Sequence, residues 1–182
     1  LAGIEVLLRH YRDPGLFNWV KLEADDSQFK VLDDVVAERI DGSYELVQVK
    51  FTVDSERYEL DWPWLLEKSG KGTSKLAKWA TSFARVAAMG RIHSACLKTN
   101  RPPSAEFRKG LVGSRVSLDK LDAGLRKSIE AECGGQAEAE LFFNSFDFLG
   151  EQPEFQDYER LLRDQIVPAD TDSLGWVYFR HH

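Results

Sequence analysis

The sequence predicts an α/β fold in which a mixed β-sheet is flanked by helices. Segments with the period of an amphipathic helix alternate with β-rich runs, and a hairpin signal lies in the first third of the chain. The sequence has no internal repeats or low-complexity linkers, and 43% of its 182 residues are hydrophobic. A chain of this length and composition can bury a core of its own. We therefore predict a single domain over residues 1–180.

The predicted elements follow one another as helix, strand, hairpin, helix and strand. The first helix ends at Asp13-Pro14-Gly15, and a lysine-rich helix begins near Thr73 or Ser74, since either residue is a good N-cap. The first helix covers residues 4–12, the other predicted helices cover residues 121–133 and 155–166, and Ser104 opens a short one. The predicted strands cover residues 17–23, 35–40, 45–53, 92–99 and 141–149, the last as an edge or fifth strand.

The hairpin carries the strongest functional signal. Its two strands are joined by Asp41-Gly42-Ser43, which supplies the positive φ that tight hairpin turns need. Antiparallel pairing across this turn brings residues 33–35 opposite residues 49–51. A carboxylate, an amide oxygen and an ammonium therefore meet at the open end of the hairpin. Such a group can hold a hard divalent cation and stabilise the charge that builds on a phosphate.

The register of the hairpin decides which aspartate takes part. Gln48 and Lys50 share one face because side chains alternate along a strand. A three-residue connection around Gly42 pairs Asp34 with Lys50, whereas a two-residue connection puts Val35 opposite Lys50 and favours Asp33. We prefer Asp34, because Val35 then points into the core. The alternative interpretation is a surface hairpin with a capping aspartate and a solvated lysine.

Basic residues recur on one side of the lysine-rich helix although the net charge is −6. They are Lys68, Lys71, Lys75, Lys78 and Arg85. The opposite side is apolar and should dock on the sheet; it carries Leu76, Trp79, Ala80, Phe83 and Ala87. Nucleic-acid binding follows local patches rather than net charge, so this basic stripe is a candidate phosphate-binding surface, with Lys71, Lys75 and Lys78 as its central residues. A solvated lysine face is the alternative.

Several other classes of protein are disfavoured. No apolar run approaches the roughly 18 residues of a membrane span, and we expect no membrane partner. Cys96 and Cys133 lack metal-ligand spacing, which indicates two reduced thiols in a cytoplasmic protein. His181 and His182 suggest a tag remnant and receive no function.

The order of helix, three-stranded meander, helix and strand resembles the core of the PD-(D/E)xK nuclease superfamily, a restriction-endonuclease-like fold. In that family an acid begins the second strand and (E/Q)xK ends the third, and Asp34 with Gln48-Val49-Lys50 is similar to the QxK variant. Several stretches also resemble double-stranded-DNA endonuclease effector domains of bacterial anti-phage systems, which precede STAND-type NTPases or accompany sensors of cyclic oligonucleotides. These stretches are 32–36, 45–51, 72–80, 97–103 and 168–176.

The resemblance implies a role for each motif residue. Asp34 would bind Mg²⁺ through its carboxylate, Gln48 through its side-chain carbonyl and Val49 through its backbone carbonyl, with Mn²⁺ as an expected substitute. Lys50 would contact the scissile phosphate or the attacking water. Many members of the family add an acid from the first helix, where Glu5 is the candidate. A glutamine in place of an acid leaves less negative charge, so Mg²⁺ should bind weakly without DNA.

The resemblance further implies a Mg²⁺-dependent endonuclease that cuts double-stranded DNA with low sequence specificity. We expect a homo-oligomer and a C-terminal NTPase or sensor region in the parent chain. Two alternatives stay open: a catalytically silent module with the nuclease fold that serves oligomerisation or docking, and a relative that cleaves RNA.

Overall fold

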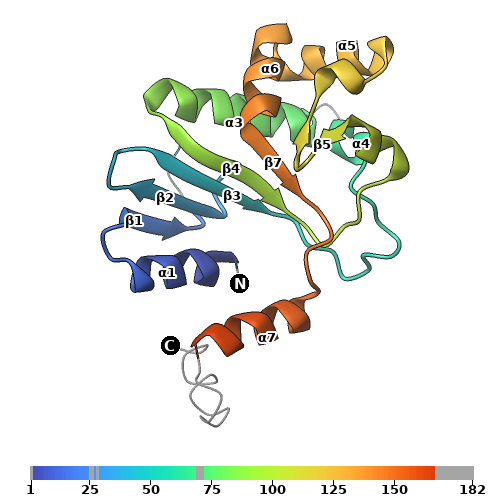
Figure 1. The fold of residues 1–182 in the computed structure, drawn as a ribbon. Helices are drawn as coiled ribbons and strands as arrows, with labels where there is room; N and C mark the ends of the chain where they lie inside the picture. The colour runs from blue at the N-terminus through green and yellow to red at the C-terminus, as the bar shows by residue number, and fades with distance from the viewer. Residues whose placement is uncertain (1, 25–26, 28, 69–71, 167–182) are drawn as a thin grey trace.

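The computed structural model describes residues 2–24, 27, 29–68 and 72–166. A five-stranded mixed sheet lies at its centre in the order β1-β2-β3-β4-β7, with helices on both faces (Figure 1). The strands of this sheet are β1 (Phe17–Leu22), β2 (Val35–Arg39), β3 (Tyr44–Val49), β4 (Ile92–Lys98) and β7 (Phe146–Leu149). The helices are α1 (Ala2–Arg12), α2 (Trp62–Leu66), α3 (Lys75–Met89), α4 (Ala105–Gly110), α5 (Ala123–Cys133), α6 (Gln136–Ser145) and α7 (Phe155–Ile166).

The sheet combines an antiparallel and a parallel half. Strands β1, β2 and β3 form an antiparallel meander, whereas β3, β4 and β7 run parallel to one another. The carboxyl ends of the three parallel strands therefore open at one edge of the sheet, and β2 begins at the same edge. Open α/β sheets commonly bind their ligands outside this edge. A mixed sheet flanked by helices is the fold class that the sequence predicts.

The two faces of the sheet bury separate hydrophobic cores. The alternation of side chains sends Leu46 of β3 and Leu97 of β4 into the larger core, which α3, α5 and α6 cover. Val47 and its neighbour Val49 point the other way, against Ala2 and Val6 of α1. Helix α7 joins this second side through Tyr158 and Leu162, which pack on Leu8.

The lysine-rich helix α3 forms as the sequence predicts. The Ser74 side chain caps it by accepting a hydrogen bond from the Ala77 N–H at 3.1 Å. Its apolar residues Leu76, Trp79, Ala80 and Phe83 are buried on the core side, and Ala87 is partly buried. Gly90, which follows α3, packs against Tyr44 at the start of β3. Helix α3 therefore runs back along the sheet and begins at the edge where β3 and β4 end.

Two predicted strands differ from the structure. Residues 141–145 belong to α6 rather than to the Phe-rich strand, because Ala139, Phe142 and Phe143 are buried at the three- and four-residue spacing of a helix. The strand is confined to β7, which pairs with β4 at the end of the sheet. The prediction for 45–53 is also too long, since β3 ends at Val49.

A small hairpin lies beyond β7. It consists of β5 (Leu111–Val112) and β6 (Arg115–Val116), followed by the single turn η1 (Leu118–Lys120). The Phe148 N–H of β7 donates to the Ser114 carbonyl at 2.7 Å, so the hairpin covers part of the sheet edge that β7 forms. Among the described helices, none is both long and apolar enough to cross a bilayer.

Both cysteines are free thiols, as the sequence indicates. Burial raises the pKa of Cys96 to about 12 and that of Cys133 to about 12. Protonated thiols are poor nucleophiles and poor metal ligands.

Candidate functional site

The hairpin adopts a register that places Asp34 opposite Gln48. Val35 pairs with Val47 and Val36 with Leu46, and the same register places Asp34 opposite Gln48, one residue beyond the end of the ladder. The Arg39 N–H donates to the Ser43 carbonyl at 2.8 Å, which leaves residues 40–42 as the connection.

Both predicted registers are therefore wrong. The observed pairing is shifted by two residues from the register that put Asp34 opposite Lys50, because the connection ends before Ser43 instead of including it. Asp41 accepts hydrogen bonds from the Ser43 N–H and hydroxyl, and this draws Ser43 to the strand side of the turn. A shift of two residues keeps every side chain on its predicted face. Asp34 and Gln48 consequently still share one face.

Asp34 is the centre of the polar cluster at this edge. Its Oδ2 atom accepts a hydrogen bond from the Val49 N–H at 2.6 Å and lies 3.5 Å from the Lys50 Nζ. The same oxygen contacts the Gln48 Nε2. Asp34 and Lys50 are both partly exposed, whereas Gln48 is only 1% exposed. The three residues that the sequence singled out thus meet around one carboxylate oxygen.

Asp33 does not join this cluster. Its backbone carbonyl accepts from the Ala24 N–H at 2.8 Å, and this bond ties the segment before β2 to the end of β1. In the part of the chain that the structure describes, the Asp33 side chain makes no hydrogen bond or ion pair with Gln48 or Lys50. The geometry therefore favours Asp34 in the choice that the sequence left open.

One buried atom of the cluster has no partner in the part of the chain that the structure describes. The Gln48 Oε1 atom is shielded from solvent and accepts no hydrogen bond from any described residue. A buried polar atom without a partner costs free energy, so native proteins rarely leave one without a reason. A half-turn of the amide would bring Oε1 toward the Asp34 carboxylate, where two oxygens would repel each other unless a cation lay between them.

The donor set suits a hard divalent cation. A carboxylate oxygen and an amide oxygen are ligands that Mg²⁺ accepts, and the backbone at Val49 already contacts the same carboxylate. Within the described residues, no three His, Cys, Asp or Glu side chains gather as a metal-binding group. A site built from one aspartate, one glutamine and a backbone carbonyl has a different composition from such a group.

Glu5, the candidate acid from the first helix, belongs to a second polar cluster. Its Oε2 atom accepts from the Lys98 Nζ at 2.5 Å and from the Tyr158 hydroxyl. Although burial opposes ionisation of Glu5, these bonds and the positive charge of Lys98 lower its pKa below the ordinary value. Lys98 follows Leu97 on the strand and so points to the α1 face, opposite to Gln48. In this structure Glu5 pairs with Lys98 instead of approaching Asp34.

The basic stripe is partly neutralised. Lys68 lies 2.5 Å from Glu132 and Lys75 lies 3.1 Å from Glu67. The Arg85 guanidinium donates to the Ser27 carbonyl at 2.8 Å. Lys78 is exposed, and Lys71 lies outside the described residues. The stripe begins at the edge of the sheet that holds Lys50, but much of its charge is already paired.

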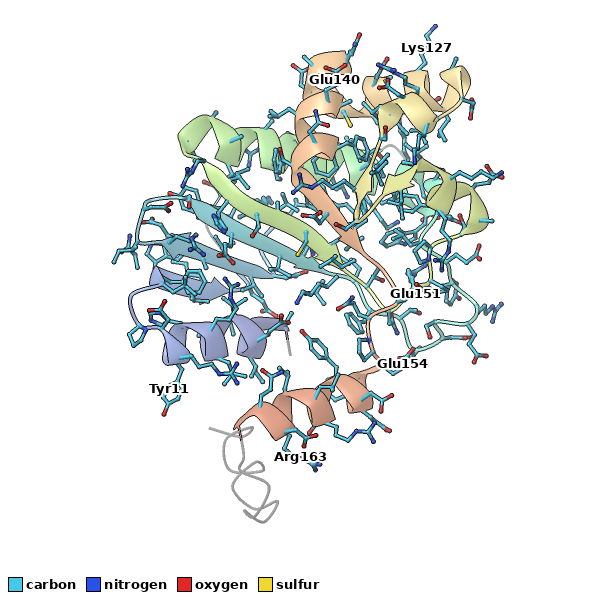
Figure 2. All side chains as sticks on the ribbon, in the orientation of Figure 1. Tyr11, Lys127, Glu140, Glu151, Glu154 and Arg163 are labelled. Atoms are coloured by element: carbon cyan, nitrogen blue, oxygen red, sulfur yellow. The ribbon has the colours of Figure 1, made fainter. Side chains whose placement is uncertain are left out.

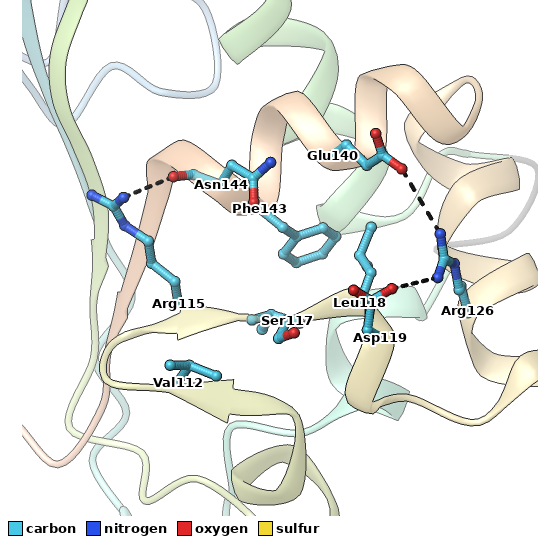
Figure 3. A pocket seen from close by; sticks show the side chains of 10 residues that line it. Val112, Arg115, Ser117, Leu118, Asp119, Arg126, Glu140, Phe143 and Asn144 are labelled. Carbon is cyan, nitrogen blue, oxygen red and sulfur yellow. Dashed lines mark hydrogen bonds and ion pairs between the residues drawn. The ribbon is translucent and has the colours of Figure 1, made fainter.

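A pocket of about 440 Å³ lies between the β5–β6 hairpin and helices α5 and α6, away from this edge (Figure 3). Arg126 sits between Asp119 and Glu140, at 2.8 Å and 3.8 Å from their carboxylate oxygens. Arg115 donates to the Asn144 carbonyl at 2.8 Å. Both arginines in the wall already bind protein oxygens, so the pocket is poorly suited to an anionic ligand.

A groove of about 770 Å³, which sequence reasoning missed, is lined by residues of the segment 56–67 and by Arg101 after β4. The Arg101 guanidinium stacks over Trp64 at 4.7 Å and over Tyr58 at 5.2 Å from the ring centroids. Carboxylates outnumber the two arginines in its wall; they are Glu56, Glu59, Asp61 and Glu67. This excess of negative charge disfavours a phosphate backbone in the groove.

Sequence reasoning also gave no role to Thr99 and Asn100, which are buried polar residues directly after β4. Polar residues at the carboxyl end of a buried parallel strand are a recognisable signal. Their partners in the hairpin segment, however, are remote in sequence.

Comparisons with known proteins assign the chain to no family. No family model matches the chain, and comparison with curated proteins and with solved structures yields no match either.

Proposed function

We propose that this chain is a metal-dependent endonuclease domain that hydrolyses phosphodiester bonds of double-stranded DNA with low sequence specificity. The observation that carries the proposal is the convergence of Asp34, Gln48 and Lys50 at the carboxyl edge of the sheet, with a buried amide oxygen that has no partner among the described residues. Carboxylate and amide oxygens can hold the cation for metal-assisted phosphodiester hydrolysis, and an ammonium can stabilise the charge on the phosphate.

Asp34, Gln48 and the Val49 carbonyl would hold Mg²⁺ or Mn²⁺. When bound, such an ion polarises a phosphoryl oxygen and lowers the pKa of a coordinated water. Asp34 supplies the one formal negative charge of this donor set. The adjacent positive charge of Lys50 offsets part of it, so the affinity for a cation should be modest before the phosphate arrives.

Lys50 would act on the phosphate. Its ammonium lies 3.5 Å from Asp34 and remains partly exposed, so it can reach a phosphodiester that approaches the cation. A fixed positive charge at this position stabilises the negative charge that grows on the phosphate in the transition state. The ammonium has three N–H donors and can also orient the attacking water.

The fold and the surroundings of the site support a DNA substrate. The order of α1, the β1–β3 meander, α3 and β4 supports a restriction-endonuclease-like fold. Lys75 and Lys78 at the start of α3 would contact the DNA backbone, Lys75 by exchanging Glu67 for a phosphate, and the proposal extends to Lys71, which lies outside the described residues. The proposed contacts of these lysines go to the DNA backbone and not to base edges, which is why we propose low sequence specificity.

The biological setting is part of the proposal. We propose a cytoplasmic effector of a bacterial anti-phage system, which acts as a homo-oligomer and is controlled by a C-terminal NTPase or sensor region of the parent chain. A site with a single formal negative charge and a paired lysine is consistent with an enzyme that stays inactive until assembly concentrates it on DNA.

Nicking of supercoiled plasmid tests the proposal. Wild-type protein at high concentration should nick and linearise the plasmid with Mg²⁺ or Mn²⁺ and stop when the metal is chelated. Lys50→Ala should lower the rate at least about 100-fold, because removal of one preorganised donor to a developing charge costs that much.

The matched control is Lys127→Ala, which removes an exposed lysine on α5, well away from α1 and α7 (Figure 2). It should cleave like wild type. Equal cleavage by Lys50→Ala and wild type would overturn the assigned mechanism. Intact plasmid together with cleaved duplex RNA would move the substrate to RNA, and no cleavage of either would favour a silent docking module.

A further inference from the structure

The segment that carries Lys50 is held in place by side chains after its strand has ended. Strand β3 stops at Val49, which pairs with Lys98 in the last step of the parallel ladder. The Lys50 N–H still donates to the Lys98 carbonyl at 3.0 Å. From this point on, the polar side chains of Thr99 and Asn100 take over the pairing that backbone groups provide within the sheet.

Thr99 binds the backbone of Lys50 itself. Its hydroxyl donates to the Lys50 carbonyl at 2.5 Å and accepts from the Arg101 N–H at 3.2 Å, so both roles of the hydroxyl are used. Thr99 is 0% exposed, and its own backbone is fixed by bonds to Leu149 and Gln152. A buried, fully bonded hydroxyl on a fixed backbone gives the Lys50 carbonyl one defined position.

Asn100 performs the same task two residues further along. Its Oδ1 accepts from the Thr52 N–H at 2.9 Å, and its Nδ2 donates to the Thr52 carbonyl at 2.7 Å. The side-chain amide therefore imitates the backbone of a neighbouring strand. Nδ2 also donates to Glu154 at 3.0 Å, and Glu154 accepts from the Ser55 hydroxyl. Glu154 directly precedes α7 and lies at the start of that helix (Figure 2).

We propose that Thr99 and Asn100 are positioning residues that fix the backbone on the carboxyl side of Lys50 and so hold its ammonium beside Asp34. This inference rests on the proposed function, because it assigns the two residues a part in the same cleavage reaction. They touch neither the phosphate nor the cation. Their effect passes through the backbone of residues 50–52, whose displacement would move the ammonium away from the reacting group.

Thr99→Val tests the role of the hydroxyl, because valine keeps the shape and loses the hydrogen bonds. The expected result is a kcat about tenfold to 100-fold lower with KM nearly unchanged, as a shift of about 1 Å in a catalytic group costs up to 100-fold. Thr99→Ser retains the hydroxyl and should recover most of the rate. Asn100→Ala should resemble Thr99→Val, whereas Asn144→Ala, which removes an exposed amide on α6, should cleave like wild type.

Two measurements do not depend on cleavage. The reactivity of Lys50 toward an amine-acylating reagent, read by mass spectrometry against exposed Lys78, should rise in Thr99→Val and stay at the wild-type level in Thr99→Ser. In wild-type protein, the Thr52 amide should exchange its hydrogen as slowly as the amides of β3. This exchange measurement needs no variant, so it stands even if Thr99→Val fails to fold.

The outcomes separate the two proposals. A folded Thr99→Val that cleaves and acylates like wild type would overturn the positioning role, and so would a rapidly exchanging Thr52 amide. The nuclease proposal would be overturned if wild-type protein cleaved no nucleic acid while Lys50 acylation still rose in Thr99→Val. That same result would support the hold of Thr99 on Lys50.

Discussion

At the carboxyl ends of β3 and β4, the two faces of the sheet carry two polar clusters that differ in how completely their atoms are paired. On the α1 face, Glu5 binds Lys98 and Tyr158, and each charged or polar group meets a complementary one. On the α3 face, Asp34 receives donors from Gln48, Val49 and Lys50 on one oxygen, while the Gln48 Oε1 has no partner among the described residues.

The difference indicates what each cluster is for. The Glu5 cluster is complete within the protein and ties both α1 and α7 to the sheet, because its members come from α1, β4 and α7. The Asp34 cluster leaves the Gln48 Oε1 without a partner among the described residues, and it includes the partly exposed Lys50. Completeness favours a structural role, and incompleteness favours a role with a ligand.

The largest expected effect comes from removing the central carboxylate charge. Asp34→Asn should lower the rate of DNA cleavage about 1,000-fold, since it removes the only formal negative charge among the proposed metal ligands. Binding of Mn²⁺, followed by calorimetry, should weaken in parallel. Asp33→Asn is the control from the neighbouring position and should leave both measurements near wild type. If Asp33→Asn rather than Asp34→Asn removed activity, the assignment of the aspartate would be wrong.

The next largest effect should fall on stability and come from the other cluster. Glu5→Gln leaves Lys98, whose side chain is 13% exposed, without its carboxylate. Loss of a partner from a buried ion pair costs several kcal/mol, but Glu5 is 38% exposed, so we expect a loss of about 1–2 kcal/mol in the free energy of unfolding. Urea denaturation measures it.

Glu106→Gln is the control for Glu5→Gln, because it removes an exposed helical ion pair with Lys109 and should change stability by less than about 0.5 kcal/mol. Folded Glu5→Gln should still cleave DNA. A variant that kept full stability and lost cleavage would place Glu5 in the catalytic cluster and remove the distinction between the two faces.

A third change would add charge to the incomplete cluster. Gln48→Glu should raise the affinity for Mn²⁺ about tenfold, because a second carboxylate strengthens a site for a hard cation. Calorimetry without DNA measures the affinity, and Gln136→Glu on the exposed start of α6 serves as the control. Unchanged Mn²⁺ affinity in a folded Gln48→Glu would argue against Gln48 as a ligand.

The smallest expected effect is a pH dependence of stability that belongs to the α1 face. Glu5 and Glu45 are both partly desolvated, yet Lys98 and Tyr158 lower the pKa of Glu5, and Arg9 and Arg39 lower that of Glu45. A lowered pKa in the folded state means that each carboxylate stabilises the fold above its ordinary value near 4.5 and loses this contribution as the pH falls through the folded pKa.

We therefore expect the free energy of unfolding to fall by on the order of 1 kcal/mol per group between about pH 5 and pH 3. Denaturation at a series of pH values measures this loss, and Glu5→Gln should show a shallower decline than wild type. An equally steep decline in that variant would assign the acid sensitivity to other carboxylates.

The sequence predicted the strands of the main sheet, helices α1, α3, α4, α5 and α7, and the face of each hairpin residue, but it did not indicate α2, α6 or the β5–β6 hairpin. The alternation of residues 45–49 and the turn glycine at 42 placed Gln48 and Asp34 on one face, because a strand has a period of two. The register was not predictable, since it depends on whether Ser43 belongs to the turn or to the strand, and the bonds from Ser43 to Asp41 decide this. The secondary structure of the Phe-rich run 141–149 was also ambiguous, because either a helix or a strand can bury its apolar side chains.

Partners that are distant in sequence account for the rest. Glu5 and Tyr158 are 153 positions apart, and Thr99 and Lys50 are 49 apart. No local pattern links such residues, so neither the pairing of Glu5 nor the hold of Thr99 on the hairpin segment could be read from the sequence. These contacts follow only from the parallel pairing of β3 with β4 and from the return of α7 to α1.

The high pKa values of the two native thiols have a practical consequence. A thiol that stays protonated at neutral pH reacts slowly with maleimides and iodoacetamides. Cys96 and Cys133 should therefore take up little label. A single cysteine introduced on the surface could carry a fluorophore or spin probe without replacing either native residue. Distances between probes on two copies would then test the proposed assembly into a homo-oligomer.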